Sequence, residues 1–130
     1  MKRNSTYIIV TENDEVGLIR ETPVTLGAAE VFEVQRIMPD ASQQVFNHSP
    51  DGFAYGYPGS GPAQLALAIL LDFLEDAQAA LRVYRAFQSE FITTLPQHNA
   101  ESDAPCPQHR IEGSKIYAWL EQREAAEVWS

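Results

Sequence analysis

Residues 63–71 constrain the fold most strongly, because this stretch is apolar on nearly every side of a helix. A helix that is hydrophobic all round has no face suited to water and must be buried. Its beginning is well marked, since Ser60 or Gly61 can serve as the N-cap and Pro62 suits the first turn, where a missing N–H costs nothing. The sequence therefore predicts a buried central helix that begins near Pro62.

The residues before this helix have the pattern of a small antiparallel sheet. β-branched and aromatic residues recur between turn-forming residues, and Asn13-Asp14 favours a tight turn between the first two strands. Pro23 and Gly27 interrupt the chain after the second strand. The predicted strands cover 7–10, 16–20 and 31–37, the last ended by Pro39, and Val45-Phe46 begins a short extended piece.

The residues after the buried helix are predicted to be mainly helical. Asp76 can cap a second helix over 77–93, prolines indicate a loop over 96–109, and Ser114 opens a final helix. The predicted fold is α+β, with a small N-terminal antiparallel sheet packed on two or three C-terminal helices around the buried one. We expect a single domain over 1–130: mainly strands in 1–50, a glycine- and aromatic-rich loop in 51–61, and mainly helices in 62–130.

Charge narrows the classes of partner. Eighteen acidic and nine basic residues give a net charge of −9, which disfavours direct binding to nucleic acid or to an anionic membrane. The same charge gives a well-solvated surface and permits binding to a basic protein. The longest apolar run, 65–71, is far shorter than the roughly 20 residues that span a bilayer. The N-terminal apolar segment is too short for a signal-peptide core, so we expect a cytoplasmic protein.

The loop before the buried helix has the composition of a ligand-binding site. Its glycines allow positive φ and close approach to a ligand, just before a helix N-terminus whose free N–H groups favour an anion. Its aromatic residues alternate, so they share a face if the segment is extended and can stack on a base or a sugar. The predicted site, for a phosphorylated aromatic small molecule, comprises His48, Ser49, Phe53, Tyr55, Gly56, Tyr57, Gly59, Ser60, Gly61 and Gln64.

The loop matches none of the standard nucleotide or hydrolase motifs. No Lys-Ser/Thr pair follows the glycines, as a P-loop requires, and Gln64 stands where a dinucleotide fingerprint needs its third glycine. Pro58 and Pro62 occupy the flanking glycine positions of a nucleophile elbow around Ser60. The structural alternative to a binding role is a tight glycine turn whose aromatic side chains fill the core.

A metal site is not predicted. Cys106-x-x-His109, with His98 nearby, has the spacing of zinc ligands, but structural zinc requires four such groups and only Asp103 remains to complete the set. A plain loop is the favoured interpretation. We predict neither a metal nor a cofactor.

Two further groups of residues suggest chemistry more weakly. His48, Ser49 and Asp51 contain the residue types of a hydrolase, but neighbouring side chains rarely face each other, and a hydrogen-bonded turn is favoured. Arg82 and Arg85 lie about one turn apart on the second predicted helix. They either face a phosphate or pair with nearby acidic residues.

Residues 48–67 resemble the hallmark of an uncharacterised family of small bacterial, phage and plasmid proteins, HSPxGFxWGYxGSGPAQLAL. Tyr55 stands where that family has tryptophan and preserves a stacking face, and Pro58 stands where it often has glycine and stiffens the loop. The following helices match loosely and the N-terminal strands poorly. The resemblance implies a mobile-element setting, in which small acidic proteins interfere with host defence.

Three functions follow from these features. The leading hypothesis is a non-enzymatic protein that holds an anionic, nucleotide-like ligand at the glycine-rich loop and so sequesters a host-defence signal. The alternative is an acidic inhibitor that binds a basic host protein of a defence complex, as an anti-CRISPR protein does. The third is a hydrolase that uses His48 and Asp51. A homodimer is compatible with the first, because paired copies can build a pocket between them.

Overall fold

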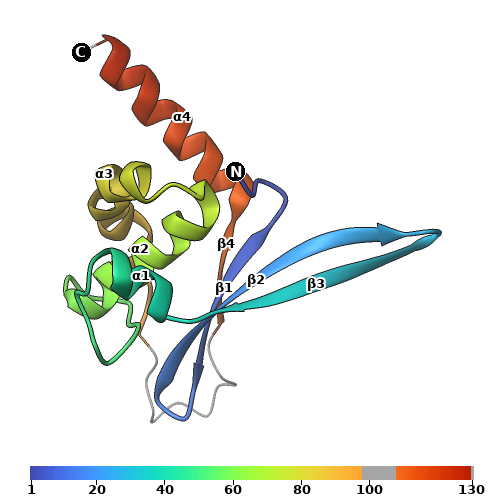
Figure 1. The fold of residues 1–130 in the computed structure, drawn as a ribbon, viewed down its shortest axis with the longest axis horizontal. Helices are drawn as coiled ribbons and strands as arrows, with labels where there is room; N and C mark the ends of the chain where they lie inside the picture. Colours follow the sequence, from blue (N-terminus) through green and yellow to red (C-terminus); the bar gives the residue numbers. More distant parts are fainter. Residues whose placement is uncertain (98–107, 130) are drawn as a thin grey trace.

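The structure, a computed structural model, describes residues 1–97 and 108–129. It has the predicted α+β architecture, in which an antiparallel sheet is followed by helices (Figure 1). The strands, in the order β3-β2-β1-β4 across the sheet, are β1 (Thr6–Glu12), β2 (Glu15–Leu26), β3 (Ala29–Ile37) and β4 (Gln108–Glu112). The helices are α1 (Asp40–Val45), α2 (Ser60–Leu74), α3 (Ala77–Phe87), a π-helical turn η1 (Gln88–Ile92) that continues α3, and α4 (Gly113–Trp129).

The first hairpin forms where the sequence predicts it. Glu12 pairs with Glu15, and the two residues between them, Asn13 and Asp14, both have positive φ. A two-residue turn of this kind matches the right-handed twist of the flanking strands, and Asn and Asp tolerate the left-handed conformation. The turn fixes the register of β1 on β2.

The second hairpin is longer than predicted and projects from the body of the protein (Figure 1). β2 was predicted to end near Arg20, before Pro23, but it continues to Leu26 and pairs with β3 up to the turn at Gly27. Pro23 is tolerated because β1 pairs with β2 only as far as Glu21, so the other side of β2 is open there. We call residues 21–35 the arm.

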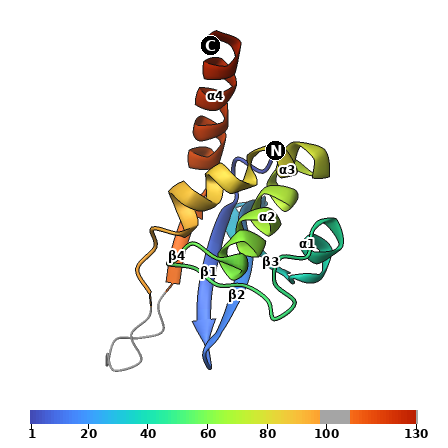
Figure 2. The same cartoon turned by 90° about the vertical axis from the view of Figure 1, so that its left-hand side faces the viewer.

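The helix α2 is buried, as predicted. All side chains from Pro62 to Leu70 are buried, together with Phe73. The helices α1, α2 and α3 lie on one side of the sheet, and α4 extends beyond its end (Figure 2). The other core residues come from the sheet (Tyr7, Ile9, Leu18, Ile111), from α3 and η1 (Ala80, Tyr84, Phe87, Ile92) and from α4 (Ile116, Trp119). α2 is therefore the centre of the core and the most rigid place on which to build a site.

Four local predictions require correction. In the piece at Val45-Phe46, predicted to be extended, only Phe46 is extended, whereas Val45 is the last residue of the short helix α1. The helix forms because Pro39 already has helical φ and ψ and Asp40 lies in the first turn, where the helix dipole favours it. The helix predicted over 77–93 ends at Phe87 and continues as the π-turn η1, although its cap is confirmed, since Asp76 accepts a hydrogen bond from Ala79 N at 3.2 Å. The loop predicted over 96–109 ends earlier, because Gln108 begins β4. The N-cap of α2 is Gly59 rather than Ser60 or Gly61.

Candidate functional site

A cavity of about 540 Å³ lies at the N-terminal end of α2, and its lining residues suit an anion. The loop before α2 and the helix itself contribute one side, and α3 and η1 contribute the other. Among the residues of the described ranges that line it, none is acidic, which is notable in a protein of net charge −9. The lining residues are His48, Pro58, Gly59, Ser60, Arg85, Gln88, Ser89 and Thr93.

The beginning of α2 presents an unneutralised helix end to this cavity. Gly59, the N-cap, is fully extended, and no side chain caps it. The first turn of α2 also lacks an acidic residue. Since the first backbone N–H groups of a helix have no partner within the helix, this end carries a partial positive charge that attracts anions.

Arg85, Tyr84 and His48 form a chain of hydrogen bonds beside the helix end. Arg85 Nε donates to the Tyr84 hydroxyl oxygen at 3.1 Å, and that hydroxyl lies 2.7 Å from His48 Nε2. The hydroxyl oxygen can accept a second hydrogen bond, so either it or His48 Nε2 can be the donor, depending on the tautomer of the imidazole. Burial, and secondarily the positive charge of Arg85, lowers the pKa of His48, which favours the neutral imidazole.

The guanidinium of Arg85 keeps its remaining donors for a ligand. In the part of the chain that the structure describes, Arg85 has no carboxylate partner. Arg82, one turn earlier on α3, lines a different surface, beside Tyr117 and Glu121 of α4. Of the two arginines singled out from the sequence, only Arg85 therefore faces the candidate site.

Gln64 holds the loop that carries His48 in place. Its side chain is fully buried, and its carbonyl oxygen accepts from His48 N at 2.8 Å and from Ser49 N at 3.1 Å. Its amide nitrogen donates to Ser42 Oγ at 2.9 Å and to the Phe46 carbonyl at 3.2 Å. These four hydrogen bonds use both donors and both acceptor positions of the amide, so the role of Gln64 is to hold the site residues in position.

The glycines of the loop are required by close packing. A side chain at Gly59 would meet the Tyr57 ring at 2.5 Å, and one at Gly61 would meet the Ala54 side chain at 2.7 Å. Gly56 has a φ of +85°, and a Cβ there would approach the Leu95 carbonyl to 2.8 Å. The Gly56 N–H donates to the Ile92 carbonyl at 3.0 Å, which ties the loop to the end of η1.

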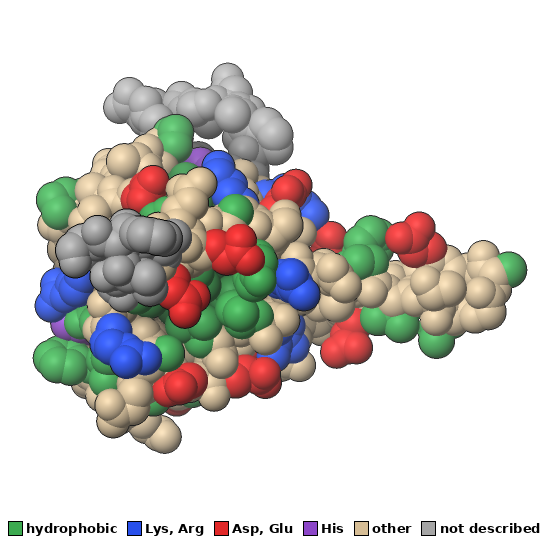
Figure 3. Space-filling view, turned by 90° about the horizontal axis from the view of Figure 1, so that it is seen from above, with side chains coloured by type: hydrophobic (Ala, Val, Ile, Leu, Met, Phe, Trp, Pro, Cys, Tyr) green, Lys and Arg blue, Asp and Glu red, His purple; other side chains and the backbone are tan. Residues whose placement is uncertain are grey.

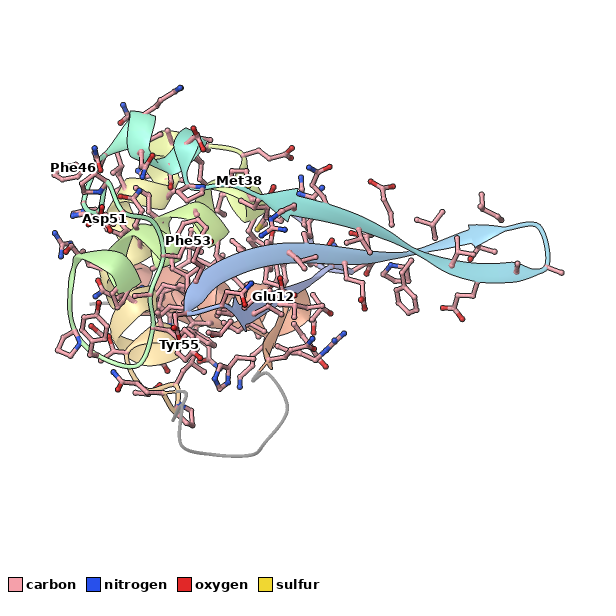
Figure 4. All side chains as sticks on the ribbon, turned by 90° about the horizontal axis from the view of Figure 1, so that it is seen from below. Glu12, Met38, Phe46, Asp51, Phe53 and Tyr55 are labelled. Atoms are coloured by element: carbon pink, nitrogen blue, oxygen red, sulfur yellow. The ribbon has the colours of Figure 1, made fainter. Side chains whose placement is uncertain are left out.

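The predicted row of three aromatic residues is dispersed by the structure. Phe53 forms an isolated bridge with Val16, and Tyr55 is buried with its hydroxyl 3.0 Å from Thr11 Oγ1. Tyr57 is 43% exposed, next to Gly59. Figure 4 shows Phe53 and Tyr55 at separate places along this loop. Only Tyr57 stands beside the candidate cavity, because the loop is not extended along its length.

A second cavity, of about 340 Å³, lies at the β1–β2 turn and has the opposite character. Glu12, Asp14, Glu15 and Asp51 all line it, together with one basic residue, Arg36 (Figure 4 labels Glu12 and Asp51). Asp51 thus belongs to this acidic cavity, whereas His48 belongs to the other, and no described contact orients one towards the other. The pairing of His48 with Asp51 that a hydrolase would need is absent among the described contacts.

The sequence-based metal candidates are only partly within the described chain. His98, Asp103 and Cys106 lie outside the described residues. His109 is in β4, where its Nε2 lies 3.1 Å from the Pro96 carbonyl. Within 1–97 and 108–129, no three His, Cys, Asp or Glu residues are grouped as metal ligands. In the same ranges, no helix has the length and apolar character to cross a membrane.

Several lining residues were not predicted. Gln88 and Ser89 line the cavity from η1, and Gln88 Nε2 donates to the Gly59 carbonyl at 3.2 Å. Tyr84 of α3 is buried and contacts His48, which lines the cavity. The available signal is the spacing of the two lining residues from Tyr84 and Arg85, since residues three and four apart share a helix face. What the sequence lacks is an indication that this face meets the beginning of α2.

Comparison with known proteins gives one match. No curated protein and no solved structure matches the chain. A family model described as a family of unknown function, DUF6166, matches residues 24–122, which include most of the arm and the whole candidate cavity. An uncharacterised family was predicted from residues 48–67, whereas the phage or plasmid origin of that resemblance stays a prediction. The chain belongs to the family of unknown function DUF6166.

Proposed function

We propose that this protein is a non-enzymatic binding protein that holds an anionic, phosphate-bearing small molecule of the nucleotide class at the beginning of α2. The observation that carries the proposal is the convergence of Arg85, without a carboxylate partner, and the uncapped N-terminus of α2 on one cavity free of described acidic residues. An anion placed there meets a positive charge and free donors, in a protein whose net charge is −9.

A phosphate group fits the donors that line the cavity. The guanidinium of Arg85 offers paired N–H groups that match phosphate oxygens, and Ser60 and Thr93 add hydroxyl groups, whereas the Ser89 hydroxyl donates to the Arg85 carbonyl. Protonation of His48 adds a further N–H donor to the site. None of these groups forms a nucleophile–base pair, so the proposal is binding rather than catalysis.

Aromatic surface next to the cavity supports a ligand with a base. Phe46 is 50% exposed and stacks on the His48 ring, with ring centroids 4.2 Å apart and planes 19° apart. Tyr57 is also exposed, and its ring lies next to Gly59. Exposed rings of this kind can stack on a nucleobase. The mobile-element setting implied by the resemblance favours a host-defence signal as the nucleotide that is sequestered.

Replacement of Arg85 by methionine tests the proposal directly. We expect isothermal titration of the wild type with mononucleotides and cyclic dinucleotides to identify a ligand, and R85M to weaken its binding by about tenfold or more, because a charge-assisted phosphate contact is lost. Arg82→Met is the matched control and should bind as the wild type, since Arg82 faces a different surface. If inorganic phosphate and every nucleotide tested fail to bind the wild type, the proposal is wrong.

The lowered pKa of His48 gives a pH-dependent prediction. An unfolded chain protonates this histidine near pH 6.5, before the folded protein does, so the unfolded state binds more protons in this window. The stability contributed by neutral His48 is therefore complete above pH 6.5 and lost as the pH falls through the folded pKa. We expect the Tm difference between wild type and His48→Gln to shrink on acidification from pH 7.5. A difference that stays constant with pH would contradict this assignment.

Ligand affinity should change in the opposite direction. Protonated His48 adds a positive charge next to Arg85, so the affinity for a phosphate anion should rise as the pH falls through the same window. The same titrations at pH 7.5 and pH 6 measure this effect. His48→Gln should remove most of the pH dependence while keeping the Arg85 contact.

A further inference from the structure

The outer edge of β3 is an open sheet edge that carries exposed apolar side chains. β3 is the terminal strand of the described sheet, and its partner β2 lies on one side only. Phe32 is 59% exposed and Val34 is 60% exposed, although both are in the middle of a strand. Figure 3 shows the arm extending from the body, with hydrophobic and acidic side chains along it.

This edge lacks most of the features that usually prevent strand pairing, although it carries the charged residues Glu30, Glu33 and Arg36. Natural edge strands are shortened, bulged, or protected by proline and lysine. β3 contains neither residue, and it pairs with β2 in one unbroken register from Ala29 to Ile37. A long regular edge with exposed apolar residues indicates a surface on which another strand is added.

The residues on one face of β3 are complementary to themselves when the strand is reversed. Glu30, Phe32, Val34 and Arg36 alternate along the strand and therefore share a face. Their order is acidic, apolar, apolar, basic. If a second β3 lies antiparallel with a two-fold axis at residue 33, Glu30 of each copy lies opposite Arg36 of the other, and Phe32 lies opposite Val34.

Arg36 lies near the carboxylates of the acidic cavity, which it lines together with Glu12, Asp14, Glu15 and Asp51. Among the described ion pairs, none involves Glu30 or Arg36. Six positions of extended strand separate them, or roughly 20 Å, so they cannot pair within one copy. Both are exposed, but the Arg36 guanidinium lies next to Gly17 of β2, so it must turn outward to meet a partner at the open edge.

We propose that the protein forms a homodimer in which β3 pairs antiparallel with β3 of a second copy and joins the two sheets into one. Each exposed Phe32 then packs on a Val34, and the four side chains form an apolar cluster around the two-fold axis. The dimer axis lies on the arm, away from the candidate cavity, so this proposal is independent of ligand binding. A strand from another protein could also add to this edge, but a second copy of β3 already has the complementary order of residues.

The least favourable contact in this dimer is between the two copies of Glu33. They lie opposite each other at the axis, and like charges in directly opposed positions destabilise a strand pair. The positive charge of Arg20, in the neighbouring strand, reduces this repulsion because it lies near Glu33. Burial lowers the pKa of Arg20, but Asp72 and, more weakly, Glu33 raise this pKa above its usual value. The dimer register thus predicts that Glu33→Gln tightens the dimer.

A charge exchange on β3 tests the proposal. The oligomeric state is measured by size-exclusion chromatography with light scattering and by sedimentation velocity over a dilution series. Wild type should dimerise, and Glu30→Arg or Arg36→Glu alone should weaken the dimer by about tenfold or more, since each creates two repulsive pairs. The double variant E30R/R36E should restore the dimer, because every cross-strand pair is opposite in charge again. Glu112→Arg, on the far edge of the sheet, is the matched control and should dimerise as wild type.

The alternatives give different results. A wild type that remains monomeric at every concentration overturns the proposal, and so does a dimer that the double variant fails to restore. A dimer weakened by Glu33→Gln also contradicts the two-fold axis at residue 33. Circular dichroism on each variant shows that the fold is retained, which the exposed positions of Glu30, Glu33 and Arg36 lead us to expect.

Discussion

Gln64→Leu is expected to destabilise the protein by about 3–5 kcal/mol, although leucine is close in size and apolar like the surrounding helix. Gln64 satisfies two backbone N–H groups, a backbone carbonyl and the hydroxyl of Ser42. Leucine would leave the two N–H groups and the carbonyl without these partners, whereas the Ser42 hydroxyl would still donate to the Pro39 carbonyl. Each unsatisfied buried polar group costs about 1–3 kcal/mol. Chemical denaturation monitored by circular dichroism measures the loss.

Gln44→Leu is the matched control for this substitution. Gln44 has the same side chain but lies exposed on α1, so its replacement should change stability by no more than about 0.5 kcal/mol. Gln64→Leu should also abolish ligand binding under conditions in which the protein remains folded, because His48 and Ser49 lose their anchor. If the free energy of unfolding of Gln64→Leu is within about 1 kcal/mol of the wild-type value, Gln64 does not hold this loop.

Features of the fold that depend only on residues close together in the sequence could be predicted. The burial of α2 follows from its apolar residues alone, and the Asn13-Asp14 turn and the Asp76 cap follow from local chemistry. β4 could not be predicted in this way. It is short, only Ile111 is buried, and it is stabilised by pairing with β1, which is remote in sequence.

The length of the arm also depends on context beyond the local sequence. Pro23 normally indicates the end of a strand, since it cannot donate a hydrogen bond to a neighbour. Pro23 is compatible with β2 because it lies beyond the part of β2 that pairs with β1. How far β1 extends along β2 cannot be deduced from the residues around Pro23. The same reasoning explains why the exposed apolar edge of β3 was not anticipated.

The location of the candidate site was predictable, whereas its composition was only partly so. Glycines and a helix beginning identify the loop, and both concern residues within a few positions of each other. The partners Tyr84 and Arg85 come from α3, and their approach to His48 depends on how α3 packs on α2. Gln64 was predicted to contact a ligand, but all its hydrogen bonds are made to the chain segment 42–49.

Asp72→Leu should have the second large effect on stability, because Asp72 joins α2 to the sheet. Its carboxylate accepts from the Tyr7 hydroxyl at 2.6 Å and from Arg20 Nη1 at 2.5 Å. Burial, with the hydrogen bond to Asp72 next in size, raises the pKa of Tyr7 well above its usual value, so Tyr7 remains a donor even in alkaline solution. Removing Asp72 leaves a buried hydroxyl and a largely buried guanidinium unpaired, which we expect to cost about 3 kcal/mol in denaturant unfolding.

The triple variant Tyr7→Phe/Arg20→Met/Asp72→Leu distinguishes the cost of unpaired groups from the net contribution of the network. Replacing a whole buried ion pair by apolar residues of similar volume is often neutral, whereas removing one partner is not. We therefore expect the triple variant to recover most of the stability that Asp72→Leu loses. A triple variant as unstable as the single one would mean that the network itself stabilises the contact between α2 and the sheet. Recovery would instead show that the three polar groups specify how α2 lies on the sheet while adding little to its stability.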